Sequence, residues 1–128
     1  MNTTFSITNF TKWKNPKNKI FEEIKDKVLG KKYELSLVFI GRKRSRKLNL
    51  KYRSKNKPTD ILSFPLSNNS GEVFICIERC KLACKKFDRK LDNFIIFLFI
   101  HGLMHLKGMD HSSTMERAEE KVRTIFKV

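Results

Sequence analysis

Residues 94–111 read FIIFLFIHGLMHLKGMDH, and they say more about the organisation of this chain than any other segment. The first seven residues are apolar on every side, which predicts a buried helix rather than an amphipathic one. His101 and His105 follow four residues apart, so on one helix their side chains leave from the same face. Gly108 stands where that helix should end, because glycine readily adopts the left-handed conformation of a helix terminus. The chain can then fold back and bring His111 toward the first two imidazoles.

The three histidines of the chain all fall within this segment. Three neutral imidazoles and one open coordination position describe a catalytic zinc-type site, whereas a structural zinc site is closed by four protein ligands. The alternative is three unrelated histidines packed in the core, and the spacing favours the metal. We therefore expect His101, His105 and His111 to hold one metal ion in a metal-dependent hydrolase.

Gly102 excludes one class of metal hydrolase. In the zincin pattern a glutamate follows the first histidine and acts as the general base of a peptidase. Because Gly102 occupies that place, some other group must handle the proton. We expect Asp110, which lies between ligands in the sequence, to orient an imidazole by a hydrogen bond.

The charge balance predicts a polyanionic partner. Lysine and arginine number 28 against 13 aspartates and glutamates, which gives a formal net charge of +15 in 128 residues. Nucleic acid is favoured over a membrane surface, because we find no basic amphipathic helix with an exposed apolar face. The apolar run at 94–100 is also far shorter than the ~20 residues of a membrane span.

The cysteine count bears on the compartment. An odd number of cysteines, Cys76, Cys80 and Cys84, argues against a disulfide framework and favours a reducing environment. Their spacing matches no common zinc or iron–sulfur pattern, so we interpret them as core residues. The first ten residues lack the charged and apolar regions of a secretory signal, and we expect a cytoplasmic protein.

The hydrophobic pattern predicts a small α/β (α+β) fold. We expect a single domain over residues 1–128, with a small mixed sheet packed against helices and the metal-bearing helix buried at the centre. Ser113 and Glu116 form a capping-box pattern before the last helix. The expected strands are 4–10, 33–40, 61–66 and 73–77, with a hairpin turn at 67–71, and the expected helices are 16–29, a short basic helix ending at 53, 78–90, 91–107 and 115–126.

Residues 52–60, YRSKNKPTD, combine cations with the rigid Pro58 and short polar side chains. A loop of this kind beside a metal can hold a phosphate, with Arg53 as its bidentate partner. The alternative is a solvated basic loop, and composition alone does not separate the two.

Together these segments resemble the YbeY family of bacterial rRNA maturation factors. Residues 101–111 resemble its signature HGxLHLxGYDH, and residues 48–65 resemble LNxxYRxKDKPTDVLSFP almost throughout. Residues 71–76 resemble its GDIxIC-like strand. Met109, Asn56 and Glu72 depart from the family pattern, and none of the three is a predicted ligand.

The resemblance implies one zinc ion per chain and metal-dependent cleavage of single-stranded RNA, in the maturation of the 3′ end of 16S rRNA and in ribosome quality control. Carried over by position, the metal ligands are His101, His105 and His111, and the catalytic arginine is Arg53. It implies rRNA and the small ribosomal subunit as partners, leaves room for ribosome-associated proteins, and implies no membrane. The alternative is a weakly catalytic or non-catalytic rRNA-binding assembly factor with a structural metal.

The rest of the basic surface is expected to hold the RNA backbone without reading its sequence. The residues expected to do so are Arg42, Lys43, Arg44, Arg46, Lys47, Lys55 and Lys57.

Overall fold

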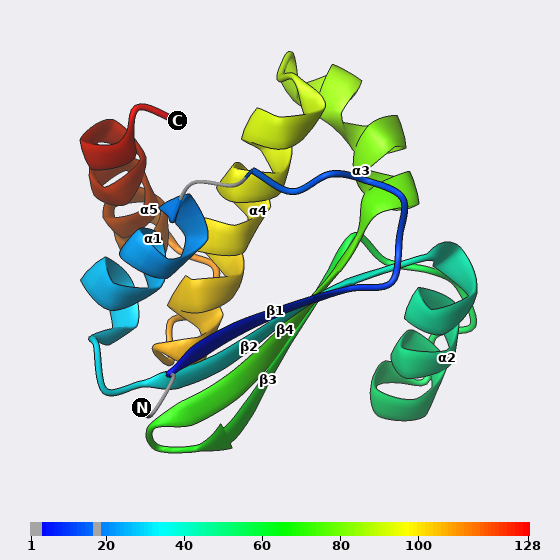
Figure 1. Cartoon of the computed structure of the whole chain (residues 1–128), viewed down its shortest axis with the longest axis horizontal. Coiled ribbons are helices and arrows are strands. Elements are labelled where there is room, and N and C mark those ends of the chain that lie inside the picture. The colour runs from blue at the N-terminus through cyan, green and yellow to red at the C-terminus, as the bar shows by residue number, and fades with distance from the viewer. Residues whose placement is uncertain (1–3, 17–18) are drawn as a thin grey trace.

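The computed structural model describes residues 4–16 and 19–128, which form a four-stranded sheet with helices on both of its faces (Figure 1). The elements in chain order are β1 (Phe5–Asn9), α1 (Ile20–Leu29), β2 (Glu34–Ile40), α2 (Arg42–Arg53), β3 (Ile61–Ser67), β4 (Ser70–Cys76), α3 (Ile77–Ala83), the 3-10 helix η1 (Cys84–Phe87), α4 (Leu91–Leu106) and α5 (Ser113–Phe126).

The sheet is mixed, as expected. Its strand order is β1-β2-β4-β3, with β1, β2 and β4 parallel and β3 antiparallel to β4. Parallel neighbours need a crossover connection, and α1 and α2 lie in the two crossovers. The antiparallel pair is joined by the predicted hairpin turn, and its register shifts between Pro65 and Ser67. Proline cannot donate to a ladder, which is consistent with the place of β3 at the edge of the sheet.

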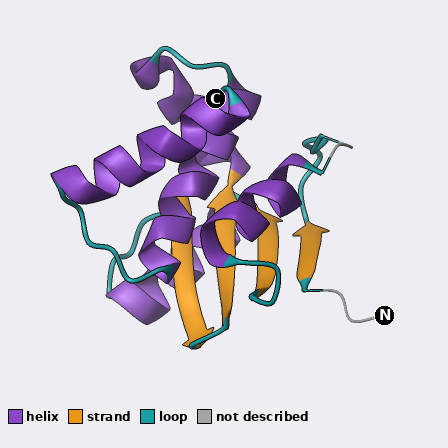
Figure 2. Ribbon diagram, turned by 90° about the vertical axis from the view of Figure 1, so that its left-hand side faces the viewer, coloured by secondary structure: helices purple, strands orange, loops and turns teal. Residues whose placement is uncertain are grey.

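The helices divide unequally between the two faces of the sheet. In Figure 1, α1, α4 and α5 lie on one side, and α2 lies alone on the other. Viewed from the side, the first group covers the strands as a separate layer (Figure 2). β2 is buried from Leu37 to Ile40 on both faces, which explains its unbroken apolar run.

Helix α4 is the central element, as the sequence predicts. It contacts β3, β4, α1, α3 and α5, and the side chains of Phe94, Ile95, Phe99 and Ile100 are fully buried. No helix in residues 4–16 and 19–128 has both the length and the hydrophobicity to cross a bilayer.

Several predicted boundaries are wrong. Helix α1 begins at Ile20 instead of residue 16, and β4 begins at Ser70 instead of residue 73. Ile77 begins α3 instead of ending β4, and the helix expected over 78–90 stops at Ala83, continues as η1 and ends at Asp88 in the left-handed region (φ 51°). The last helix begins at Ser113, and its cap is Ser112, whose Oγ accepts a hydrogen bond from the Met115 amide at 3.1 Å. The capping box predicted for Ser113 and Glu116 is therefore wrong, because the cap is Ser112 and the residue three positions on is Met115, which cannot form the reciprocal hydrogen bond.

The cysteines lie where the core interpretation puts them. Cys76, Cys80 and Cys84 are free and buried. Burial raises the pKa of the Cys80 thiol far above its usual range, so this side chain behaves as a small apolar residue.

Candidate metal centre

After α4 the chain turns back toward the same helix. The Met109 amide donates to the Met104 carbonyl and the Gly108 amide donates to the His105 carbonyl, both at 3.0 Å. This pair of bonds is the Schellman motif, and Gly108 supplies its left-handed residue with φ 93°. The predicted role of Gly108 is confirmed, and the turn delivers His111 to the face that carries His101 and His105.

The three imidazoles form a nearly equilateral group. Their ring centroids are 4.7 Å apart for His101 and His105, 4.8 Å for His105 and His111, and 5.0 Å for His101 and His111. One nitrogen from each ring lies within 4.8 Å of the other two. His101 and His105 are partly buried and His111 is exposed, so the group opens to solvent on the His111 side.

Hydrogen bonds fix the tautomers of the two inner histidines. His105 Nδ1 lies 3.1 Å from the Met109 carbonyl oxygen, which can only accept, so His105 Nδ1 carries a proton. His101 Nδ1 donates to Glu119 Oε1 at 2.6 Å. Glu119 is nearly buried on α5, and Arg123 Nη1 lies 3.7 Å from its second oxygen. Both imidazoles therefore turn Nε2 toward the cavity.

This arrangement fits a metal ion. The two Nε2 atoms lie 3.1 Å apart, and with both Nδ1 atoms protonated each presents a lone pair to the other. Burial, and after it the neighbouring His101 and His111, lowers the pKa of His105, so that ring is neutral at pH 7. Two facing lone pairs repel unless a cation lies between them. Two nitrogens on one tetrahedral zinc, each bound at about 2.0–2.1 Å, lie about 3.3 Å apart, close to the spacing seen here.

Gly102 has a packing role at the position where zincins carry glutamate. A Cβ on Gly102 would lie 2.8 Å from both Ile61 Cδ1 and Ser63 Oγ. Only a residue without a side chain lets α4 approach β3 this closely. The approach makes β3 one wall of the histidine site.

The three histidines and Arg53 share one cavity of about 360 Å³. Arg53 ends α2, and the loop after it is fastened to that helix. Ser45 Oγ donates to the Thr59 carbonyl and accepts from the Thr59 amide, and Asn49 Nδ2 donates to the Lys57 carbonyl at 2.8 Å. The other lining residues are Thr59, Asp60, Ile61, Ser63 and Gly102.

The residues expected to bind RNA lie on α2 and its following loop, outside the histidine cavity. All seven are exposed: Arg42, Lys43, Arg44, Arg46, Lys47, Lys55 and Lys57. Helix α2 contains no acidic residue. Arg42, Lys43, Arg44 and Arg46 line a second hollow of about 640 Å³ together with Phe10 and Pro58.

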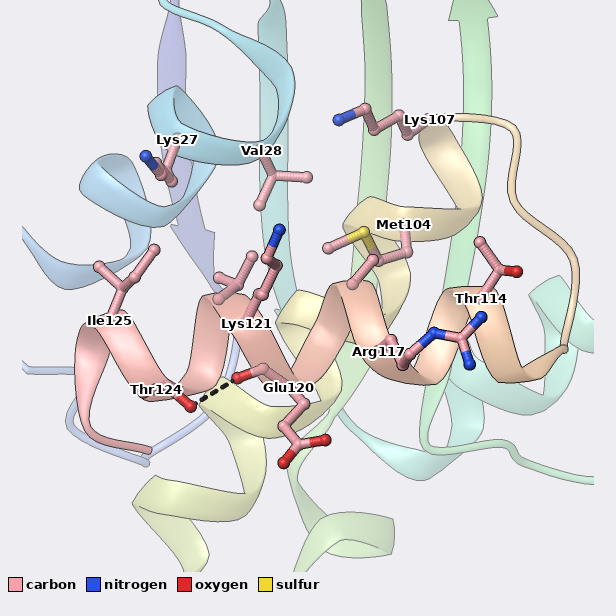
Figure 3. A pocket seen from close by; sticks show the side chains of 12 residues that line it. Lys27, Val28, Met104, Lys107, Thr114, Arg117, Glu120, Lys121, Thr124 and Ile125 are labelled. Carbon is pink, nitrogen blue, oxygen red and sulfur yellow. Dashed lines mark hydrogen bonds between the residues drawn. The ribbon is translucent and has the colours of Figure 1, made fainter.

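A larger basic groove, of about 990 Å³, lies between α1 and α5 (Figure 3). Lys27, Lys107, Arg117 and Lys121 line it over an apolar floor that includes Val28 and Met104. Lys121 points up between the helices, and Glu120, which points to the other side of α5 in Figure 3, is the one carboxylate among the lining residues. This groove has cations and no cluster of ligands, so the candidate chemical site is the smaller cavity with the histidines.

Sequence reasoning missed two polar groups of the site. It gave the orienting role to Asp110, which is exposed, whereas the carboxylate on His101 is that of Glu119. Glu119 is 18 residues from His101, and no spacing rule marks it. The sequence pattern predicts no role for Asp60, whose carboxylate is among the groups that line the cavity.

Comparison with known proteins identifies the family of this chain. A family model described as Endoribonuclease YbeY matches residues 2–127. Endoribonuclease YbeY of Onion yellows phytoplasma is 37% identical over 123 residues, covering 89% of this chain and 79% of that protein. Endoribonuclease YbeY of Finegoldia magna is 37% identical over 92 residues, covering 66% of this chain and 60% of that protein.

The fold also has a counterpart among solved structures. The solution structure of TM1509 from Thermotoga maritima superposes with a TM-score of 0.64, at 22% sequence identity, over 95% of this chain and 92% of that one. The match of the family model over nearly the whole chain, the two relatives and the converging histidines lead to one conclusion. This chain belongs to the YbeY family of endoribonucleases.

Proposed function

We propose that this protein is a zinc-dependent endoribonuclease that cleaves single-stranded RNA, with His101, His105 and His111 as the ligands of one zinc ion. The observation that carries the proposal is that the Nε2 atoms of His101 and His105 face each other at 3.1 Å, in the cavity that Arg53 also lines. The names of the relatives and the net charge of +15 support RNA as the substrate.

When bound, a zinc ion supplies Lewis-acid activation of water and of a phosphate oxygen. The side chains around it do the remaining work. Glu119 and the Met109 carbonyl hold two imidazoles in the tautomer that leaves Nε2 free. Arg53 faces the same cavity and is placed to bind the phosphate and offset the negative charge that develops during cleavage. Asp60 and Ser63 are the neighbouring groups that can accept a proton or hydrogen-bond a ribose hydroxyl.

We infer further that the RNA is ribosomal and that the protein acts in the cytoplasm, in 3′-end maturation of 16S rRNA and in ribosome quality control. A basic surface without a nucleotide-reading motif suits a substrate recognised by its backbone and by its place on a particle. The exposed cations of α2 are the proposed contacts to that backbone.

The test is cleavage of a single-stranded RNA by purified protein with and without chelator, combined with elemental analysis. We expect stoichiometric zinc and cleavage that is lost on chelation. His111→Ala should abolish cleavage while circular dichroism and RNA affinity stay unchanged, because His111 is exposed and lies outside the core. Cleavage that persists in chelator would contradict the proposal.

One observation favours the second candidate, an rRNA-binding assembly factor with a structural metal. The hydrogen bond between His101 and Glu119 joins α4 to α5, so an ion at the histidines also strengthens a contact between helices. If this is the role, metal removal lowers the thermal midpoint markedly, and wild-type protein binds RNA without cutting it.

A further inference from the structure

Tyr52 presents an aromatic ring at the surface of a strongly basic helix. It lies in the last turn of α2 and is 55% exposed. The ring is held from one side by Phe64 of β3, with centroids 4.8 Å apart and planes at 53°. Phe64 in turn packs edge-on against Phe74 of β4 at 5.8 Å. The ring is therefore fixed by a row of aromatic side chains that ends in the sheet.

Both partners of this pair are next to residues of the histidine cavity. Arg53 follows Tyr52 and lines the cavity, and Ser63, which precedes Phe64, lines it as well. Successive residues of a strand point to opposite faces, so Phe64 lies on the other face of edge strand β3 from Ser63. The aromatic pair therefore lies on the other side of edge strand β3 from the predicted ligands. Arg53 is next to Tyr52 in the chain and also lines the cavity, so it connects the two sides.

Cations accompany the ring. Lys51 Nζ lies 5.2 Å from the centre of the Tyr52 ring, and Arg53 follows on the cavity side. Neither Lys51 nor Arg53 belongs to an ion pair among the described residues. An exposed aromatic ring with a cationic residue before and after it in the sequence matches the chemistry of a nucleotide, whose base offers a π-face and whose flanking phosphates are anionic.

Another exposed aromatic shows why position matters. Phe87 is 54% exposed and packs on Phe94 and Phe97, at 5.2 and 5.8 Å between centroids. It lies on η1, beside the first turns of α4, whereas the histidines are at the other end of that helix. Phe87 thus matches Tyr52 in exposure and support and differs in its distance from the cavity.

We propose that Tyr52 is a base-stacking subsite. The unpaired base next to the phosphodiester bound in the cavity stacks on the exposed part of the Tyr52 ring, and Lys51 and Arg53 bind the phosphates on its two sides. This inference rests on the proposed function, and it gives a physical source for the preference for single strands. A base held in a duplex cannot leave its stack to cover the ring without breaking its pair.

The test uses the zinc-loaded full chain and 2′-O-methyl RNA octamers labelled at one end, with fluorescence anisotropy as the readout. A set of octamers, each with one abasic position, locates the stacked base, and gel analysis verifies that the RNA stays intact. The variants are Tyr52→Ala, Tyr52→Phe and the matched control Phe87→Ala. Stacking on an aromatic residue contributes roughly 5- to 100-fold in affinity per base.

We expect Tyr52→Ala to weaken binding of intact octamer by that factor, and Tyr52→Phe and Phe87→Ala to stay within about twofold of wild type. One abasic position should cause the same loss in wild type and no further loss in Tyr52→Ala. The dependence of affinity on salt should be the same for Tyr52→Ala and wild type, because stacking releases no counterions. If Tyr52→Ala does not fold, Tyr52→Leu keeps the apolar contact with Phe64 and removes the π-face, and the same losses are expected.

The inference is overturned if Tyr52→Ala binds as tightly as Phe87→Ala, or if the abasic and Tyr52 losses add independently. It is also overturned if Tyr52→Phe is as weak as Tyr52→Ala, which would assign the effect to the hydroxyl group. Those results leave the proposed function intact. Failure of the wild type to bind or cleave RNA at all contradicts both.

Discussion

At the scale of single residues, the site depends on atoms that hold the imidazoles as much as on the imidazoles themselves. Glu119 and the Met109 carbonyl each accept from an Nδ1 and so determine which nitrogen faces the cavity. The glutamate also carries negative charge next to His101, which makes the Nε2 of that ring a stronger ligand for a metal ion.

Glu119→Gln tests this role. The amide still fills the space but brings no negative charge, so we expect zinc affinity to fall about 10- to 100-fold. The measurement is competition with a chromogenic chelator at fixed pH. Glu120→Gln is the matched control, because Glu120 is exposed and points away on the same helix (Figure 3). Equal affinities for the two variants would show that Glu119 has no part in metal binding.

Gly102 offers a second test at this scale. In an ordinary helix interior, replacing glycine by alanine stabilises by up to about 1 kcal/mol. Here the new Cβ would lie 2.8 Å from Ile61 Cδ1 and Ser63 Oγ, so these two side chains must change rotamer or α4 and β3 must separate. We expect Gly102→Ala to lower the free energy of unfolding by about 1–3 kcal/mol, measured by urea denaturation. A stabilised variant would mean that β3 adjusts freely.

At the scale of elements, the end of α1 is organised by a buried lysine that no sequence rule marks. Lys25 is fully buried, and its Nζ donates to the carbonyls of Gly30, Lys31 and Tyr33 at 3.0–3.2 Å. It also lies 2.8 Å from Asp26 Oδ1. The ammonium group gathers the carbonyls of the α1–β2 turn, of which that of Gly30 also accepts from the Tyr33 amide at 3.3 Å.

Lys25→Met keeps the length of the side chain and removes its donors. The carbonyls of Gly30, Lys31 and Tyr33 then lose this donor, and that of Tyr33 is buried, so we expect a loss of at least about 2 kcal/mol in the free energy of unfolding. Lys27→Met, two residues away and exposed, is the control and should change stability by less than about 0.5 kcal/mol. Similar unfolding curves for the two variants would contradict the assigned role.

At the scale of the whole molecule, most of the surface cations lie away from the histidine cavity. The histidine cavity is small and faces the edge strand, whereas the cations of α2 lie on the opposite face of the sheet and those of the α1–α5 groove lie beyond α4. RNA bound along α2 would reach the cavity at Arg53, the residue that belongs to both regions.

The salt dependence of RNA affinity tests this path. Each phosphate contact on a single strand adds about 0.7 to the slope of log affinity against log salt. We expect Arg42→Gln with Arg46→Gln to reduce the slope by about 1.4 between 50 and 200 mM salt. Lys81→Gln with Lys85→Gln, equally exposed on α3 and η1, should leave the slope unchanged. A slope that responds equally to both pairs would mean diffuse attraction without a path.

Much of the fold could be predicted because the pattern is local. Strand alternation, the apolar run of α4 and the glycine at its end identify nearly every element, since each depends on residues a few positions apart. The errors lie where two signals compete: Ser112 and Ser113 both suit a helix cap, and backbone conformation decides between them. The ending of α3 as a 3-10 turn likewise depends on how η1 packs Cys84 and Phe87 onto α4.

The amino-acid sequence by itself determined the histidine spacing, the left-handed turn that returns His111 and the excess of positive charge, because these follow from helix geometry and composition. Only the tertiary structure decided which carboxylate meets His101, why Gly102 excludes any side chain and which loop residues share the cavity. Those contacts join α4 to α5, α4 to β3 and α2 to its following loop. The residues involved are brought together by packing, and no regular interval in the chain records that they meet.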